Sequence, residues 1–167
     1  MALKKNNRTY ISISIKNQEL SLYEKETLTK RFSISTAKNG IGQQKNSFKT
    51  PLGKHIVRAK IGDNLPIFTV FSARRSINKV LTPEDALSQT KKDWILSRII
   101  WLSGLEVGFN RLGNVDTMQR YIYIHGTPYE TDLGQPVSEG CIRMANRDVI
   151  ELFNLISVGT NVLINEN

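Results

Sequence analysis

The sequence contains little that could form a disulfide or cross a membrane. Among its 167 residues there is one cysteine, Cys141, so no internal disulfide can form. Uninterrupted apolar runs reach only four residues, far short of the roughly 20 that span a bilayer and of the apolar segment of a signal peptide. Residues 1–8 carry the positive charges of a secretory signal, but no apolar segment follows them. We therefore expect no membrane span and see no signal peptide, which leaves the compartment open.

Acidic residues are scarce relative to basic ones. Fifteen Asp and Glu stand against 23 Lys and Arg, which gives a formal net charge of +8. Such a charge favours an acidic partner, for example nucleic acid, anionic lipid or an acidic polymer. The basic residues come as scattered pairs at 4–5, 74–75 and 91–92 rather than as one run. The charge therefore supports an acidic partner without specifying it.

The composition is that of a soluble globular domain, with 40% apolar and 23% charged residues and no repeat or linker. We therefore expect a single domain over residues 1–167. Its first half is predicted to be β, because short runs alternate polar and apolar residues. The predicted strands cover 10–15, 19–23, 31–35, 55–59 and 67–71, the first two as a hairpin. Residues 37–53, rich in Gly and Pro, are predicted to form a loop with little order of its own.

Two helices are predicted in the second half. Residues 82–85, Thr-Pro-Glu-Asp, have the cap, proline and carboxylates that favour a helix start. The second helix should begin with Asn146 as its cap and end near Gly159. A closing strand is predicted over 161–164. The expected fold is mainly β with two short helices.

The segment whose residues could carry out a reaction is 121–143. Residues 121–124 read as a strand, with His125 and Gly126 at its end, and a loop containing Pro and Gly could bring Cys141 back beside His125. We expect this pair at, or slightly beyond, hydrogen-bonding distance. An imidazole can take the thiol proton to leave a nucleophilic thiolate, and later return it to a leaving amine.

Two neighbours of Cys141 suit the same chemistry. Gly140 would allow close approach of the backbone to a substrate, and amides at this turn could stabilise an oxyanion. Arg143 presents a planar fork that fits a carboxylate.

The ordered series His125-Gly126, then Ser138-x-Gly140-Cys141-x-Arg143, resembles the signature of the L,D-transpeptidase (YkuD-type) family. Residues 17–23 are similar to the opening hairpin of that family, 50–53 to its Thr-Pro-x-Gly turn, and 116–126 to the run that leads into its histidine. The resemblance covers about residues 10–164. Glu139 departs from it, because many members have histidine there.

The resemblance implies a β-sandwich or barrel and a set of site residues. Cys141 would be the nucleophile and His125 the general base, with the Gly126 carbonyl bonded to the second imidazole nitrogen. Ser138, Gly140 and Arg143 would lie in the site, with Arg143 on a substrate carboxylate.

The resemblance also implies a reaction. The thiolate would attack a peptidoglycan tetrapeptide stem, release D-alanine, and pass the acyl group to an amine or to water. The partners would be stem peptides, with a wall-anchored lipoprotein as a further partner. No cofactor and no nucleic acid would be involved, and the place of action would be extracytoplasmic, for example periplasmic. Such an enzyme would serve cell-wall construction and cell shape.

Structural alternatives exist for several of these residues. Cys141 could be an inert buried thiol, and Arg143 could pair with Asp148 or Glu139 on the surface. Ser138 could bond its own turn. Asp116 is an alternative partner for His125.

A metal site is not expected. His55, the other histidine, is read as structural, and two distant histidines with one cysteine are a poor ligand set for zinc. The rival function is a non-catalytic basic module that binds nucleic acid or an anionic wall polymer. It would explain the charge but not the ordered motif.

Overall fold

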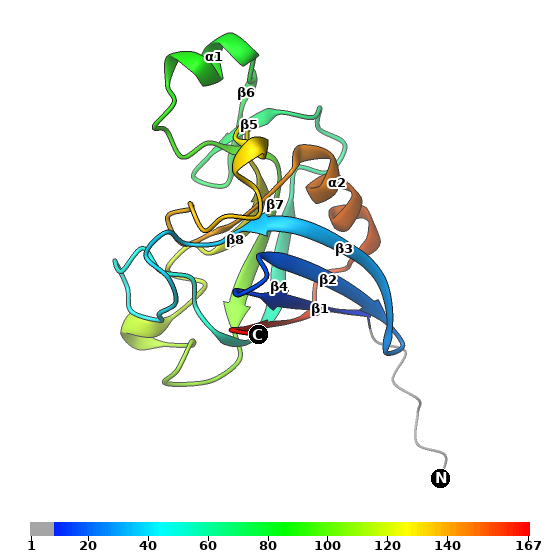
Figure 1. Ribbon diagram of the computed structural model, residues 1–167, viewed down its shortest axis with the longest axis vertical. Helices are drawn as coiled ribbons and strands as arrows, with labels where there is room; N and C mark the ends of the chain where they lie inside the picture. Colours follow the sequence, from blue (N-terminus) through cyan, green and yellow to red (C-terminus); the bar gives the residue numbers. More distant parts are fainter. Residues whose placement is uncertain (1–8) are drawn as a thin grey trace.

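The computed structural model describes residues 9–167, whose strands join in one hydrogen-bonded sheet (Figure 1). The order within these residues is β4-β10-β1-β2-β3-β9-β8-β7-β5-β6, and β4 also pairs with β7. That extra pairing closes eight of the strands into a ring, which β5 and β6 extend. The strands are β1 (Thr9–Ser14), β2 (Glu19–Glu24), β3 (Thr27–Ser35), β4 (Gly53–Ile61), β5 (Thr69–Ser72), β6 (Arg75–Val80), β7 (Ile95–Gly104), β8 (Tyr123–Gly126), β9 (Ile142–Met144) and β10 (Asn161–Asn165).

The prediction of a mainly β fold with two short helices is confirmed for the described residues: α1 (Pro83–Ser88) and α2 (Asn146–Leu155). Thr82 caps α1 as predicted, because its side chain accepts the N–H of Asp85 while the Asp85 carboxylate accepts the N–H of Thr82. In Figure 1, α1, β5 and β6 lie together at the upper end of the molecule.

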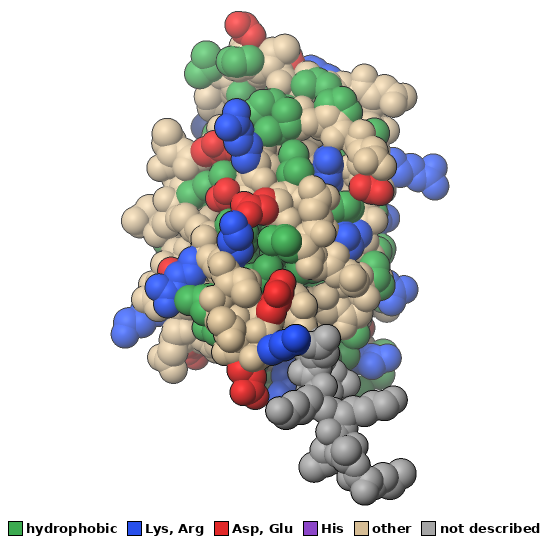
Figure 2. Space-filling view, turned by 90° about the vertical axis from the view of Figure 1, so that its right-hand side faces the viewer, with side chains coloured by type: hydrophobic (Ala, Val, Ile, Leu, Met, Phe, Trp, Pro, Cys, Tyr) green, Lys and Arg blue, Asp and Glu red, His purple; other side chains and the backbone are tan. Residues whose placement is uncertain are grey.

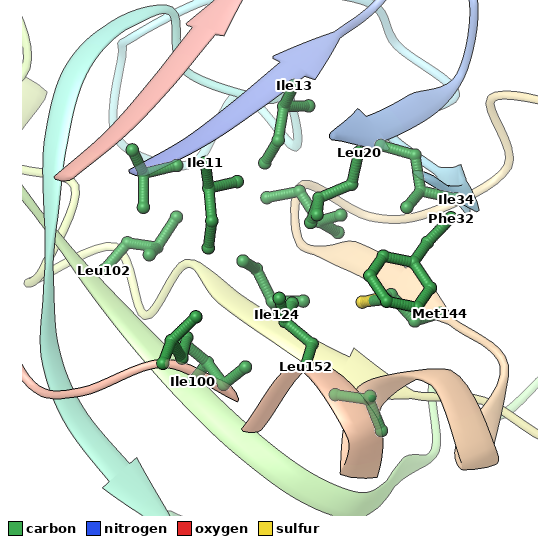
Figure 3. Packing of buried hydrophobic residues seen from close by; sticks show 14 of the residues in the cluster. Ile11, Ile13, Leu20, Phe32, Ile34, Ile100, Leu102, Ile124, Met144 and Leu152 are labelled. Atoms are coloured by element: carbon green, nitrogen blue, oxygen red, sulfur yellow. The ribbon is translucent and has the colours of Figure 1, made fainter. Parts of the chain in front are cut away.

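A continuous apolar core fills the space inside the ring (Figure 3). Ile11 and Ile13 alternate along β1, and both are fully buried against residues of β3, β7, β8 and β9. The burial of each such side chain contributes about 1.5–3 kcal/mol. Leu152 of α2 reaches the same cluster, so the helix closes one side of the core against β7 and β8.

Several predicted boundaries are wrong for local reasons. Asn146 is the first residue of α2 and Ala145 is its N-cap, because the Asn146 side chain is used in tertiary hydrogen bonds. The helix ends at Leu155, well before Gly159. The strand predicted over 121–124 begins at Tyr123, since Tyr121 has a left-handed φ of 56°. His125 and Gly126 therefore lie inside β8, not beyond it.

The segment 37–53 is better organised than predicted. Ala37 forms a bridge with Ser138, and Ile41 with Thr50. The buried Thr50 hydroxyl accepts the N–H of Ala37 at 2.9 Å and donates to the carbonyl of Gly140 at 2.9 Å. The segment thus supports the turn that carries Cys141.

No helix within residues 9–167 is long and apolar enough to cross a membrane. On the face drawn in Figure 2, the Lys and Arg side chains are interspersed with Asp and Glu. This face therefore carries mixed charge rather than one basic patch.

Candidate active site

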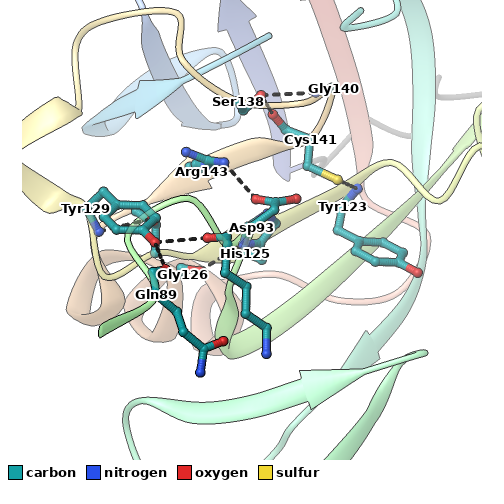
Figure 4. A network of polar contacts seen from close by, with 12 residues as sticks. Gln89, Asp93, Tyr123, His125, Gly126, Tyr129, Ser138, Gly140, Cys141 and Arg143 are labelled. Carbon is teal, nitrogen blue, oxygen red and sulfur yellow. Dashed lines mark hydrogen bonds and ion pairs between the residues drawn. The ribbon is translucent and has the colours of Figure 1, made fainter. Parts of the chain in front are cut away.

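The two halves of the motif come together because β8 and β9 are parallel neighbours. Their register pairs Ile124 with Ile142 and His125 with Arg143. Side chains opposite each other in neighbouring strands lie on the same face of a sheet. Cys141 directly precedes β9 and lies beside the start of β8, where the Tyr123 N–H donates to its sulfur at 3.3 Å (Figure 4). Residues 16 positions apart in the sequence thus share one site.

Cys141 is held as a neutral thiol in this structure. Its Sγ donates to the Tyr121 carbonyl at 3.3 Å in addition to accepting from Tyr123. Burial raises the pKa of the Cys141 thiol to about 12, and the nearby carboxylate of Asp93 adds to this effect. The Tyr123 N–H and the guanidinium groups of Arg143 and Arg120 oppose it. The residue as a whole is partly exposed, and it lines a cavity.

The His125 ring is held in one orientation and one tautomer. Its Nδ1 lies 2.8 Å from the carbonyl oxygen of Gly126, the contact that the family resemblance implies. A carbonyl only accepts, so Nδ1 carries the proton and Nε2 has the free lone pair. The ring is 0% exposed, and burial lowers its pKa, although the Asp93 charge and the Gly126 carbonyl oppose this shift. The imidazole is therefore neutral near pH 7.

The two side chains are not hydrogen-bonded to each other. His125 Nε2 is buried and has no hydrogen-bonding partner among the described residues, while the sulfur is engaged with Tyr121 and Tyr123. A rotation of the thiol away from the Tyr121 carbonyl would be needed to bring the proton to Nε2.

Arg143 pairs with neither of the acidic residues named as alternatives. Its Nη2 donates to the carboxylate of Asp93 at 2.7 Å, and the side chains are 9% and 28% exposed. The guanidinium carbon also lies 5.9 Å from the centre of the Tyr129 ring. The alternatives Asp148 and Glu139 are thus wrong. Nothing in the sequence pattern around Asp93 indicated its role.

The turn before Cys141 is held by hydrogen bonds among its own residues. The Ser138 hydroxyl donates to the carbonyl of Cys141 at 2.6 Å and accepts the N–H of Gly140 at 3.2 Å. The observed hydrogen bonds of Ser138 are therefore those of the structural alternative, in which it bonds its own turn. The Gly140 N–H is thus engaged by Ser138, and the role of the amides of this turn toward an oxyanion stays a prediction. Gly140 has φ +128°, a conformation that disfavours a side chain.

Asn146, predicted as a helix cap, instead supports the site through its side chain. Its amide donates to the carbonyl of Thr127 at 2.7 Å and to the carboxylate of Glu130 at 2.8 Å, and its oxygen accepts from Ser97 at 2.7 Å. A Cβ on Gly126 would collide with this Asn146 oxygen and lie 2.7 Å from the Leu96 carbonyl. Gly126 and Asn146 together fix the strand end that holds His125.

Asp116 and His55 are structural in their contacts. Asp116 accepts backbone N–H groups from Leu112 at 2.7 Å and Gln119 at 2.9 Å, so it is wrong as the partner of His125. His55 is fully buried, between the Gly53 carbonyl and the Thr117 hydroxyl.

Two cavities meet at this site. One, of about 500 Å³, is lined by Cys141, Asp93 and Arg120 among others. The second, of about 550 Å³, is lined by Arg143, Ser138 and others. Glu139, an exposed residue, lines both.

These features define a mainly β protein in which a thiol, a neutral imidazole and a guanidinium gather on two parallel strands. The model of the L,D-transpeptidase catalytic domain (YkuD) matches residues 8–164. The chain belongs to this family.

Relatives of the chain carry the same family name. YqjB of Bacillus subtilis (strain 168), named as an L,D-transpeptidase, is 48% identical over 61 residues, which are 36% of this chain and 33% of YqjB. YkuD of the same organism, also named as an L,D-transpeptidase, is 55% identical over 42 residues, 25% of this chain and 26% of YkuD. The matched segments thus span about a third or less of either relative.

Solved structures share the fold. An L,D-transpeptidase from Mycobacterium smegmatis superposes with a TM-score of 0.57 at 16% identity, over 95% of this chain and 58% of that one. An L,D-transpeptidase from Xylanimonas cellulosilytica gives a TM-score of 0.57 at 16% identity, over 98% and 63%. At this identity the likeness concerns the fold.

Proposed function

We propose that this protein is a peptidoglycan L,D-transpeptidase that works through Cys141 and His125. The observation that carries the proposal is the parallel pairing of β8 with β9, which brings a partly exposed cysteine to the face that holds a neutral, oriented imidazole. Family membership supplies the reaction class.

The reaction proceeds in two transfers. His125 Nε2 takes the proton of Cys141, and the thiolate attacks the carbonyl of the L-centre of a diamino acid in a tetrapeptide stem. The tetrahedral intermediate collapses, the bond to D-alanine breaks, and the imidazolium returns the proton to the departing amine. The resulting thioester is then attacked by an acceptor amine, giving a cross-link, or by water, giving carboxypeptidase action.

Recognition of the stem is assigned to Arg143 and to the lining of the two cavities. Stem peptides carry carboxylates, and a guanidinium binds a carboxylate through two parallel hydrogen bonds. Ser138, Gly126 and Gly140 shape the site through the backbone that they fix. The net charge of +8 favours approach of an acidic polymer.

The setting of the reaction belongs to the same proposal. The whole chain acts as one catalytic domain, and nucleophile, base and carboxylate-binding group are all protein side chains. The place of action is outside the cytoplasmic membrane, the partners are stem peptides, and a wall-anchored lipoprotein is a further acceptor. A non-catalytic basic module is disfavoured, because it would leave the oriented His125 and the nearby thiol without a role.

The test is to incubate the protein with a purified disaccharide-tetrapeptide and to identify the products by mass spectrometry. We expect release of D-alanine and an acyl adduct on the intact protein. Cys141→Ala and His125→Gln should each abolish both, with unchanged secondary structure. His55→Gln is the matched control, since it alters the other buried histidine outside the site. D-Alanine release by folded Cys141→Ala protein would refute the assignment.

A further inference from the structure

Asp93 is bonded to Arg143, whose guanidinium the proposed function assigns to a substrate carboxylate. Its carboxylate accepts a hydrogen bond from Arg143 at 2.7 Å and lines the same cavity as the sulfur of Cys141. Figure 4 shows this carboxylate between the guanidinium and the cysteine, close to the buried His125. While Asp93 is in place, the Nη2 nitrogen of Arg143 is therefore not free for a substrate carboxylate.

The segment that carries Asp93 is anchored on both sides. Trp94 is buried in a small apolar cluster with Val70, Leu81 and Leu96. The Tyr129 hydroxyl lies 2.9 Å from the carbonyl of Lys92 and 3.1 Å from that of Gln89. The Arg143 contact is thus part of a fixed arrangement, and only the short Asp93 side chain must turn to release the guanidinium.

We propose that Asp93 is a positioning residue that holds Arg143 in the substrate-free enzyme and gives it up when a carboxylate of the incoming molecule takes its place. The identity of that molecule as a stem peptide rests on the proposed function. The exchange of one carboxylate for another at Arg143 does not depend on the proposed function.

The charged groups that face Cys141 are of both signs. Asp93 opposes ionisation of the thiol, while Arg143 and Arg120 favour it, and Glu139 and Arg74 line the same cavity. The titratable neighbours are His125, Tyr121 and Tyr123. A substrate carboxylate that takes the place of Asp93 at Arg143 brings an equal negative charge to the same guanidinium. The exchange therefore seats the substrate beside the thiol without changing the net charge there.

Alkylation of Cys141 tests this without peptide substrate. Iodoacetate carries a carboxylate and iodoacetamide is its neutral isostere, and in both reactions the thiolate displaces iodide. We expect Asp93→Asn to raise the ratio of the iodoacetate rate to the iodoacetamide rate by roughly tenfold at low salt, because Arg143 becomes free to bind the reagent. The pH midpoint of alkylation should also fall. In Asp93→Asn/Arg143→Gln the gain in the ratio should disappear.

Two controls separate charge from access. Glu84→Gln removes an equal charge from an exposed position on α1, in the same segment, and should leave both rates unchanged. Tyr129→Phe removes the hydroxyl that anchors Gln89 and Lys92, and should change both rates alike.

An unchanged reagent ratio in Asp93→Asn would overturn the proposal, as would a gain that survives in the double variant. The outcome is separable from the proposed function. A selective gain for iodoacetate without turnover of stem peptide would sustain the exchange at Arg143 and refute the transpeptidase assignment, and turnover without the gain would do the reverse.

Discussion

His55 should make the stability of the protein depend on pH, although it lies outside the site. It is fully buried, with Nδ1 2.9 Å from the Gly53 carbonyl and Nε2 3.0 Å from the Thr117 hydroxyl. Because Nδ1 must donate to the carbonyl, the neutral ring accepts from Thr117 through Nε2. Burial lowers the pKa of His55 from 6.5 to about 4, against smaller opposing effects of the Gly53 carbonyl and Glu106.

The sign and size of the effect follow from linkage. Between pH 6.5 and about 4 the unfolded chain binds a proton at His55 that the folded chain does not. His55 therefore contributes fully to the free energy of unfolding above pH 6.5, and this contribution is lost as the pH falls through the window. At about 1.4 kcal/mol per pH unit, the displacement from 6.5 to about 4 corresponds to a loss of about 3 kcal/mol.

Urea unfolding of the parent and of His55→Gln at several pH values from 7.5 to about 4 measures this loss. His125, whose pKa is also lowered, and the carboxylates contribute equally to both proteins, so the difference between the two curves isolates His55. We expect the parent to lose about 3 kcal/mol more than His55→Gln across the window. Parallel curves would refute the reasoning and would mean that the folded protein accommodates the charged ring.

Three further changes have defined outcomes. Arg143→Lys should lower kcat/KM for stem peptide by roughly ten- to a hundredfold, because lysine keeps the charge but loses the fork, and parent-like kinetics would contradict a carboxylate contact. Thr50→Val should destabilise the fold by about 1–3 kcal/mol for each group left unpaired, Ala37 N–H and Gly140 carbonyl, as measured by urea unfolding. Gly126→Ala should reduce thiol acylation more than the control Gly108→Ala does, because Gly108 has open space around it. Melting temperatures of both variants are measured alongside. Equal effects on acylation would argue against a role of Gly126 in holding His125.

The parts of the fold that could be predicted from the sequence are those with one-sided burial. β1 alternates because one of its faces meets the core and the other does not, and α1 begins at an exposed capping sequence. β7 was not predicted as a strand, because its central residues are buried on both faces and show no period of two. β9, with three residues, is too short to leave a pattern, although it positions Arg143.

The motif located Cys141, His125 and Arg143 because chemistry restricts the residue types at these positions. It could not indicate which other residues contact them. Asp93 and Asn146 act through contacts across 50 and 49 residues of sequence, with Arg143 and Ser97 respectively, and such distant pairs leave no local signal.

The omission matters for the electrostatics of the site. From the motif alone, a thiol next to an imidazole and a guanidinium suggests a cysteine that ionises readily. In the folded protein, burial and the Asp93 carboxylate raise the pKa of Cys141, while burial lowers that of His125, so the proton stays on sulfur. A neutral thiol is protected from oxidation and from stray electrophiles, since the thiolate is the reactive form. The same arrangement keeps the free lone pair of His125 ready as a base. Ionisation of the thiol therefore depends on transfer of its proton to His125, and the Asp93–Arg143 pair is the contact at which an anionic substrate can be seated beside that thiol.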